Sequence, residues 1–400
     1  MTGTEPDLAL AGYRVLDLGR VIAGPHLAQL LGDMGADVIH VEPPDGGDDS
    51  RQIPPFIGEM SVNFLISNRN KRSITLNLKT PRGIDLLKQL VETADILVES
   101  NRPGVTERLG IDYETLSRVN PRLVMTSISG FGQTGPSRHL AGYNQIAQAM
   151  GGMMSLTGSP DGPPMRTAAI VGDYLASLYG AFGTMVALVH RDRTGRGQWV
   201  DASLYESMVA VLGPAFQEYL SFGTVRQRTG NWAPTMAPSN LYRAADGDVM
   251  IVAGNQRHWR SLCEAMQRPD LIEHEGFATG RARVANVGEV DRIIEAWSSR
   301  FASAQIVDEL NRRGVPCATV NDVGQVVESP QTAARGLVAD MSVPGLGDVK
   351  TLGVLPRLSH TPGSIRLPPP ELGQHNEEVY AELLGLSAEE VGALRREGVI

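Results

Sequence analysis

One long stretch decides the predicted fold: residues 168–205, which read AAIVGDYLASLYGAFGTMVALVHRDRTGRGQWVDASLY. An apolar run leads to Asp173, and no proline interrupts roughly five helical turns after it. Small residues recur in these turns at spacings of three and four: Ala176, Gly180, Gly183 and Ala187. This spacing gathers them on one face of a helix. We therefore predict a long helix that packs tightly along a face of small side chains.

Asp173 lies where this helix is expected to begin. An aspartate at that point can accept hydrogen bonds from the first free backbone N–H groups, so physics alone favours an N-cap. The positive end of the helix dipole also favours an ionised carboxylate. The same geometry would present a charged, oriented oxygen that can act as a nucleophile. The two interpretations are compatible.

A glycine-containing turn follows the helix. Two glycines within Thr194–Gln198 permit a tight turn into a strand, which we predict over Trp199–Tyr205. Three arginines surround the turn: Arg191, Arg193 and Arg196. Cations near the C-terminal end of a helix are favourable for its dipole, which is sufficient to account for them.

The composition limits the class of protein. With 400 residues, of which 42% are hydrophobic, the chain is long enough for about two or three domains with a large core. Its net charge of −9 argues against a general nucleic-acid binder, because nothing concentrates the positive charge that phosphate backbones require. A local anion site remains compatible with this charge.

Two cysteines are present, Cys263 and Cys317. They are too few for a disulfide framework and have no Cys or His partner at metal-ligand spacing, so we expect buried thiols in a reducing compartment and no metal site. Residues 1–7 lack the basic start of a signal peptide, and no apolar run approaches membrane-spanning length. We expect a cytoplasmic protein that binds neither membrane nor nucleic acid.

The first elements read as a βαβ unit: a strand over Tyr13–Leu18, a helix over Pro25–Met34 and a strand over Ala36–Glu42. This βαβ unit contains no Gly-x-Gly-x-x-Gly, which weakens a dinucleotide-binding interpretation, because the pyrophosphate needs those glycines for close backbone approach. Residues 19–24 can still bring backbone N–H groups to a ligand at the carboxyl end of the first strand.

Strands and helices continue to alternate. Further strands are predicted at Ser73–Leu78, Ala94–Val98 and Leu123–Ser127, with a helix starting at Thr80-Pro81 and another over Tyr113–Val119. This pattern predicts an α/β fold with a large Rossmann-like parallel-sheet domain and helices on both faces. Ligands in such sheets bind at the carboxyl ends of the strands, where we expect residues 99–104.

Five cations are expected near these strand ends: Lys71, Arg72, Lys79, Arg102 and Arg108. Each alone is more often a solvated surface charge than a phosphate ligand. Together they suit a ligand that carries several phosphates, because Arg and Lys supply the bidentate and point-charge contacts that phosphates need.

The helix and turn quoted first resemble the class III CoA transferases of the CaiB/BaiF type. The resemblance rests on the Asp173 segment, followed by Arg-x-x-Thr-Gly-Arg-Gly-Gln-x-Val-Asp-Ala-Ser-Leu at residues 191–204. It extends from Val15–Leu18 and Val21–Pro25 to Leu372–His375. The family contains formyl-CoA transferase, carnitine CoA-transferase and the alpha-methylacyl-CoA racemases. Coverage from end to end is far more specific than any single motif.

The resemblance implies that Asp173 is catalytic and that CoA is a substrate, with no cofactor beyond CoA. The positions expected to contact CoA are Val21, Ile22, Ala23, Leu76, Asn77, Leu78, Lys79, Ser100, Asn101, Arg108 and Tyr143. Pro43 stands where formyl-CoA transferase has a basic residue, so any contact from that side chain is lost.

The resemblance also implies an interlocked homodimer and a division of the chain. We expect a large CoA-binding domain over residues 1–224, a small α+β domain over 225–323, and a C-terminal segment over 324–400 that returns to the large domain. The patterns in the middle range include a hairpin signal at Asp246-Gly247 and helices over Trp259–Met266, Val290–Trp297 and Ala304–Arg312.

The leading hypothesis is an acyl-CoA:carboxylate CoA-transferase in which Asp173 forms first an acyl anhydride and then a CoA thioester. A 2-methylacyl-CoA racemase is the alternative, but Tyr143 stands where the racemases have a histidine, and racemisation needs two proton-transfer groups. Asn144 adds no replacement base, and His139 is out of register and expected at the surface. An acyl-CoA-binding protein without catalysis is a third hypothesis. An NAD-dependent enzyme is the fourth, because the first βαβ unit lacks the glycines of a dinucleotide-binding motif.

Overall fold

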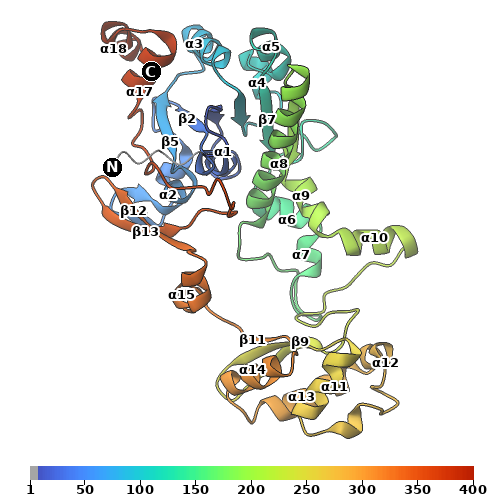
Figure 1. Ribbon diagram of the computed structural model, residues 1–400. Helices are drawn as coiled ribbons and strands as arrows, with labels where there is room; N and C mark the ends of the chain where they lie inside the picture. The colour runs from blue at the N-terminus through green and yellow to red at the C-terminus, as the bar shows by residue number, and fades with distance from the viewer. Residues whose placement is uncertain (1–7) are drawn as a thin grey trace. The chain divides into compact units, whose positions relative to one another are not determined.

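The computed structural model describes residues 8–400 (Figure 1). Residues 1–7, on which the expected absence of a signal peptide rests, lie outside this range. The chain divides into two compact units. The first contains the chain up to Met153 together with Arg166–Gln217 and Ala333–Ile400, and the second contains Met154–Met165 and Glu218–Thr332. The range that we predicted for the smaller domain, 225–323, falls within the second unit.

Six parallel strands form the sheet of the first unit, in the order β5-β2-β1-β6-β7-β8. Their bounds are Lys71–Thr75 (β5), Asp37–Glu42 (β2), Arg14–Leu18 (β1), Ile96–Glu99 (β6), Val124–Ser129 (β7) and Trp199–Ser203 (β8). This is the strand order of a doubly wound Rossmann-like sheet. The predicted fold class of the large domain is confirmed.

Helices cover both faces of this sheet (Figure 1). One face carries α1 (Ala23–Asp33) and α8 (Val171–Thr194), and the other carries α3 (Pro81–Glu92), α5 (Tyr113–Val119), α17 (Asn376–Leu384) and α18 (Ala388–Arg396). Neighbouring strand residues alternate between the two cores: Val15 packs with α1, and Leu16 packs with α3. A strand with both faces buried reads as a continuous apolar run, as residues 96–98 of β6 do.

The first unit contains shorter elements at its edges. Its further helices are η1 (Asp49–Gln52), α2 (Val62–Ser67), α4 (Val105–Leu109), α6 (Asn144–Met150) and α9 (Leu204–Val211). Its small hairpins are β3–β4 (Phe56–Ile57, Met60–Ser61) and β12–β13 (Val338–Val343, Gly347–Leu352). Helices α7 (Met153–Leu156), α10 (Gly213–Phe222) and α16 (Pro330–Ala334) span the boundaries of the units. We did not predict the β12–β13 hairpin.

Helix α8 packs through its small residues, as predicted. Ala176 and Ala187 are fully buried. A Cβ atom added at Gly180 would lie 2.7 Å from Cδ1 of Leu27 on α1, and one added at Gly183 would lie 2.6 Å from Cγ1 of Val200 on β8. The small face therefore lets α8 approach both α1 and the last strand of the sheet.

Strand β8 is shorter than predicted, because a helix cap ends it. The Ser203 side chain accepts a hydrogen bond from the Glu206 N–H at 3.1 Å and donates to the Glu206 carboxylate at 2.7 Å. This reciprocal pair starts α9 at Leu204, so Leu204 and Tyr205 are helical. The strand-like pattern of the preceding residues continues to Tyr205, so we did not predict that a helix begins at Leu204.

The second unit has a three-stranded antiparallel sheet in the order β11-β10-β9. Its elements are β9 (Ser239–Arg243), β10 (Asp248–Val252), α11 (Gln256–Ala265), η2 (Pro269–Leu271), α12 (Gly280–Ala285), α13 (Val287–Ser298), α14 (Ser303–Arg312), β11 (Cys317–Thr319) and α15 (Val323–Glu328). The hairpin at Asp246-Gly247 is confirmed. Cys263 and Cys317 are free and buried, as expected, and burial raises the pKa of the two thiols to about 12 and about 11.

Within residues 8–400, no helix has both the length and the apolar character that crossing a membrane requires.

The turn between α8 and β8 provides a test of the fold. A Cβ atom added at Gly197 would lie 1.9 Å from the Leu123 carbonyl oxygen, a backbone atom that no side-chain rotation can move. We expect Gly197→Ala to lower the free energy of unfolding by about 1–3 kcal/mol or more, measured by urea denaturation. Gly288→Ala is the matched control, because no atom lies within 4 Å of the added Cβ and alanine favours the helix. Equal midpoints for the two variants would contradict the packing described here.

Candidate active site

The candidate site lies where β1 and β6 end side by side in the sheet. The chain leaves β1 toward β2 on one side and leaves β6 toward β7 on the other, so the two following loops diverge and open a crevice. The loops are tied together, because the Arg20 N–H donates to the Ser100 hydroxyl oxygen at 2.9 Å. A cavity of about 190 Å³ lies at this point.

Several predicted residues line this cavity together. Val21 and Ala23 come from the loop after β1 and the start of α1, and Ser100 and Asn101 come from the loop after β6. Tyr143 contributes from the residue before α6, and Asp173 from the first turn of α8. Asp173 and five of the expected CoA contacts thus meet in one place.

Asp173 is not the N-cap of α8, which corrects the interpretation favoured by physics alone. The N-cap is Ile170, whose side chain makes no capping hydrogen bond, and Asp173 is the third helical residue. The first turn is instead held from α6, because Asn144 Oδ1 accepts the Gly172 N–H at 3.0 Å. The Asp173 carboxylate is therefore not used to cap the helix, and it lines the cavity.

A second contact fixes the Asp173 turn against α1. The Ser177 hydroxyl lies within 2.7 Å of the Ala23 carbonyl oxygen and 2.8 Å of the Asp173 carbonyl oxygen. Ser177 is buried and lies one turn beyond Asp173 on α8. The amino ends of α1 and α8 are thereby joined beneath the cavity.

Burial changes the acidity of Asp173. It raises the pKa of this carboxyl to about 6, and the residue's own backbone N–H opposes the rise only in part. No ion pair to Asp173 is present among the described residues. At neutral pH the group is therefore an ionised carboxylate whose charge is poorly stabilised, a condition that increases the reactivity of a nucleophile.

Other predicted contacts lie outside the cavity wall. Ile22 is buried as the N-cap of α1. The Leu76 side chain packs in the sheet core, and Asn77 accepts the Lys79 N–H and donates to the Gly398 carbonyl, so both side chains have structural contacts. Leu78 packs against the same core.

The two cations among these predicted contacts are exposed. Lys79 follows β5, and Arg108 lies on α4. Neither lines the cavity at Asp173. Their role as CoA contacts stays a prediction.

Lys71 and Arg72 are not free cations at the carboxyl ends of the strands, contrary to our expectation. They begin β5, at its amino end. Lys71 Nζ is fully buried and lies 2.7 Å from Asp17 Oδ2, and Arg72 pairs with Asp37, Glu378 and Glu382. The charge pattern alone could not distinguish these ion-paired cations from free ones.

Sequence reasoning missed part of the cavity wall. Arg20 and Ser129 line it, although neither was singled out. Gly130 and Gly142 also line it and touch each other, since a Cβ atom added at Gly142 would lie 2.4 Å from the Gly130 Cα atom. Gly130 and Gly142 stand on either side of the loop over residues 131–141. That pattern could have indicated a close approach of the two ends of the loop. His139 is exposed, as expected.

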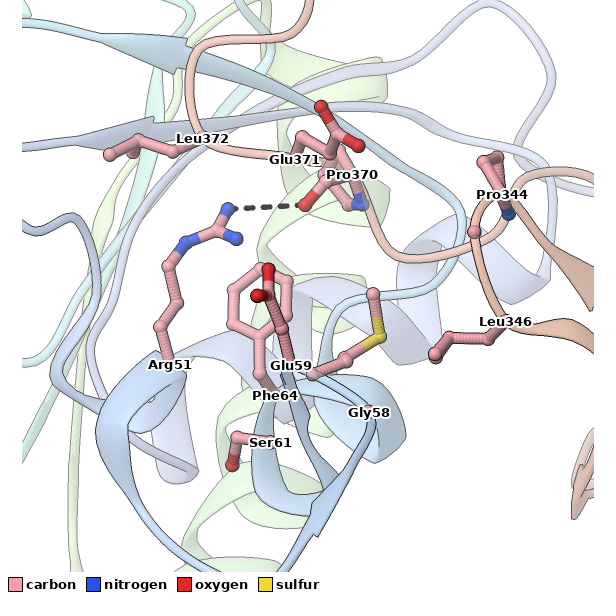
Figure 2. A pocket seen from close by; sticks show the side chains of 12 residues that line it. Arg51, Gly58, Glu59, Ser61, Phe64, Pro344, Leu346, Pro370, Glu371 and Leu372 are labelled. Atoms are coloured by element: carbon pink, nitrogen blue, oxygen red, sulfur yellow. Dashed lines mark hydrogen bonds between the residues drawn. The ribbon is translucent and has the colours of Figure 1, made fainter.

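A larger cavity of about 580 Å³ lies elsewhere in the first unit (Figure 2). Its Arg51 is already bound, because the guanidinium makes two 2.7 Å contacts with the Glu42 carboxylate and donates to the Pro370 carbonyl at 3.2 Å. The side chain also stacks on Phe64. Its two carboxylates, Glu59 and Glu371, are exposed, whereas Asp173 is half-buried, so volume alone does not identify the active site.

The sequence matches a family model over nearly its whole length. The model of CoA-transferase family III matches residues 10–376. A succinyl-CoA–D-citramalate CoA-transferase of Chloroflexus aurantiacus is 40% identical, with both chains fully covered. A succinate–glutarate CoA-transferase of Agrobacterium fabrum is 39% identical, over 94% of this chain and 95% of the relative.

A solved structure has the same fold. The crystal structure of a CaiB/BaiF family protein from Brucella suis aligns with a TM-score of 0.83 and 36% identity. The alignment covers 94% of this chain and 99% of the other.

The raised pKa of Asp173 predicts an effect on stability. A carboxylate whose folded-state pKa is raised costs stability once pH exceeds its unfolded value, and the full cost is present above pH 6. Asp173→Asn removes this cost. We expect the variant to be more stable than the wild type at pH 8 by up to about 3 kcal/mol, and equally stable near pH 3.5. Thermal unfolding at both pH values measures this, and coincident curves at pH 8 would contradict the burial of the charge.

Proposed function

The chain belongs to CoA-transferase family III and is a CoA-transferase, and from this premise we propose that Asp173 carries the transferred acyl group. One observation supports the proposal above the others. The Asp173 carboxylate lines the cavity at the switch point of the sheet, and burial raises its pKa. No side chain of the described residues donates a hydrogen bond to it, so its oxygens are available for attack.

The exchange proceeds by covalent steps that conserve the thioester energy. An Asp173 oxygen attacks the carbonyl carbon of the donor acyl-CoA, the C–S bond breaks, and a mixed anhydride and CoA thiolate form. The thiolate then attacks the Asp173 carbonyl carbon, which releases the donor acid and leaves an aspartyl-CoA thioester. The acceptor carboxylate attacks that thioester, the C–S bond breaks, and a second anhydride and CoA thiolate form. The thiolate finally attacks the acceptor carbonyl, which yields the new acyl-CoA and free Asp173.

Each tetrahedral intermediate needs hydrogen-bond donors for its oxyanion. The amino end of α1 supplies candidates, because its N-cap has no side-chain hydrogen bond. The N–H groups of Ala23 and Gly24 have no partner in residues 8–400. Ala23 lines the cavity with Asp173, so these N–H groups are the proposed oxyanion donors.

We propose a dicarboxylic acid as the donor acyl group, with succinyl-CoA as the first candidate. The names of both relatives contain succinyl-CoA or succinate. In addition, Arg20 and Arg102 line the cavity. The nearest carboxylate to Arg20, that of Asp49, is 3.9 Å away, so its guanidinium is available to an anion such as a distal carboxylate or a CoA phosphate.

We also propose a cytoplasmic homodimer. Free, buried thiols are compatible with a reducing compartment. Helix α8 carries an outward apolar stripe: Leu178, Phe182, Val186 and Val189. Phe182 is 70% exposed in the single chain, and monomeric proteins rarely leave such a stripe uncovered. We propose that this stripe lies in the interface of the homodimer.

Trapping the acyl group tests the proposed role of Asp173. The protein is incubated with succinyl-CoA, quenched, treated with hydroxylamine and digested. We expect a hydroxamate at Asp173 by peptide mass spectrometry. Asp173→Asn is expected to give no adduct and to lower the exchange rate by at least about a thousandfold.

Two controls sharpen this experiment. Butyryl-CoA has the same chain length without the distal carboxylate, and an equal yield of adduct would contradict the dicarboxylate proposal alone. Asp173→Asn with undiminished turnover would contradict the proposed nucleophile. Tyr143 disfavours the racemase, because the racemases have a histidine at that position. A chiral 2-methylacyl-CoA that gains α-deuterium from D₂O in the absence of an acceptor acid would instead favour the racemase.

The dimer proposal predicts the effect of a charge on α8. We expect Phe182→Glu to shift the protein from the mass of a dimer to that of a monomer, because burying an unpaired carboxylate in an apolar interface is unfavourable. Light scattering coupled to gel filtration measures this. Gln89→Glu, which adds a charge at an exposed position of α3, is the control. A wild-type monomer, or a Phe182→Glu dimer, would contradict the proposal.

A further inference from the structure

The loop between β1 and α1 has an unfavourable backbone conformation at the cavity wall. Val21 has a φ of 66°, in the left-handed region that β-branched residues avoid. Val21 lines the cavity together with Ala23, whose N–H group is a proposed oxyanion donor. A conformation of this kind persists only where surrounding contacts enforce it.

The loop is too narrow to relax by spreading its ends. A Cβ atom added at Gly19 would lie 2.7 Å from the Gly24 Cα atom, so the two ends of the loop are in backbone contact. The first three N–H groups of the loop each donate a hydrogen bond to a side chain. Gly19 donates to Asp17 at 2.9 Å, Arg20 donates to Ser100 at 2.9 Å, and Val21 donates to Asp48.

We propose that Asp48 is a positioning residue for the CoA-transfer reaction: its buried carboxylate holds Val21 in the left-handed conformation and thereby fixes the wall of the Asp173 cavity. Both carboxylate oxygens of Asp48 accept the Val21 N–H, at 3.1 and 3.2 Å. The proposal depends on the suggested role of Asp173 only for the location of the reacting atoms.

Asp48 is itself firmly held. It is 1% exposed, and its Oδ1 accepts the Ser50 N–H at 2.7 Å. Its own N–H donates to Glu42 at 2.9 Å. Glu42 in turn binds Arg51, whose contact with the Pro370 carbonyl is visible in Figure 2. The carboxylate that fixes the loop is thus anchored to the C-terminal segment of the chain.

A row of buried charges keeps Asp48 ionised. His40 lies between two carboxylates, with Nδ1 3.0 Å from Asp17 and Nε2 3.6 Å from Asp48. Burial lowers the pKa of His40, but the neighbouring Asp17 and Glu42 carboxylates outweigh it and raise the pKa to about 9. Burial likewise raises the pKa of Asp48, but the contact with His40 and the bond from Ser50 hold it well below its usual range. Lys71 balances the charge of Asp17.

A double-mutant cycle between Asp48 and Val21 tests this role. Glycine adopts a positive φ without strain, so a loop with Val21→Gly needs no clamp. We expect Asp48→Ala to lower the rate of acyl-CoA exchange at least tenfold in the wild-type background and less than about threefold in the Val21→Gly background. Asp48→Asn keeps one acceptor oxygen and is expected to lose less activity than Asp48→Ala.

The readouts separate positioning from general stability. Exchange of labelled succinate into succinyl-CoA does not presuppose the covalent intermediate, so a failed trapping experiment at Asp173 leaves this test intact. If the wild type does not turn over succinyl-CoA, CoA affinity is measured by calorimetry through the same cycle, with the same expected reduction of the Asp48→Ala effect. Urea unfolding checks that each variant is folded.

Asp33 provides the matched control. It is also 1% exposed and ion-paired, with Arg69 at 2.7 Å, but it makes no contact with the loop. We expect the effect of Asp33→Ala to be the same with and without Val21→Gly. The proposal is overturned if Asp48→Ala has equal effects in both backgrounds, or if Val21→Gly reduces the effect of Asp33→Ala as much as that of Asp48→Ala.

Discussion

The close approach of α8 to α1 is the constraint on which the rest of the first unit depends. Glycines and alanines on α8 leave room for Leu27 and Val200, and the Ser177 hydroxyl can then reach the Ala23 carbonyl. A larger side chain on this face would separate the two helices. The cavity exists because the amino ends of both helices lie at the edge of the sheet where the parallel strands β1 and β6 end side by side.

Asp48, which is buried, and Asp173, which is half-buried, show how surroundings decide the behaviour of one chemical group. Asp48 has a cationic histidine and backbone N–H groups around it, so its charge is well stabilised despite burial. Asp173 is partly removed from water and has no charge partner, so its pKa is raised. The first arrangement suits a permanent anchor, and the second suits a group that reacts.

Much of the fold followed from patterns in the sequence. The apolar strands, the proline helix start at Thr80-Pro81 and the small residues of α8 are local features, and each led to the correct element. The start of α9 inside a predicted strand was missed, because a capping serine looks like any polar strand residue until its Glu206 partner is considered. The β12–β13 hairpin was also missed.

The site was predictable only in part, for a physical reason. Asp173, Val21 and Tyr143 belong to recognisable motifs, whereas the role of Asp48 depends on a contact with Val21 across 27 residues. Lys71 and Arg72 were misjudged because their carboxylate partners lie far away along the chain. Sequence spacing reports contacts within one helix or turn, but it does not report which buried charges pair across a sheet.

The absence of side-chain donors on the Asp173 carboxylate, within the described residues, has a consequence for turnover. A carboxylate tied into several hydrogen bonds would have to give them up each time its oxygen became part of an ester-like bond, and recover them afterwards. Asp173 has little to give up. Its loaded and unloaded forms can therefore share one rigid scaffold, and the protein has no need to rearrange between successive chemical states of the same side chain.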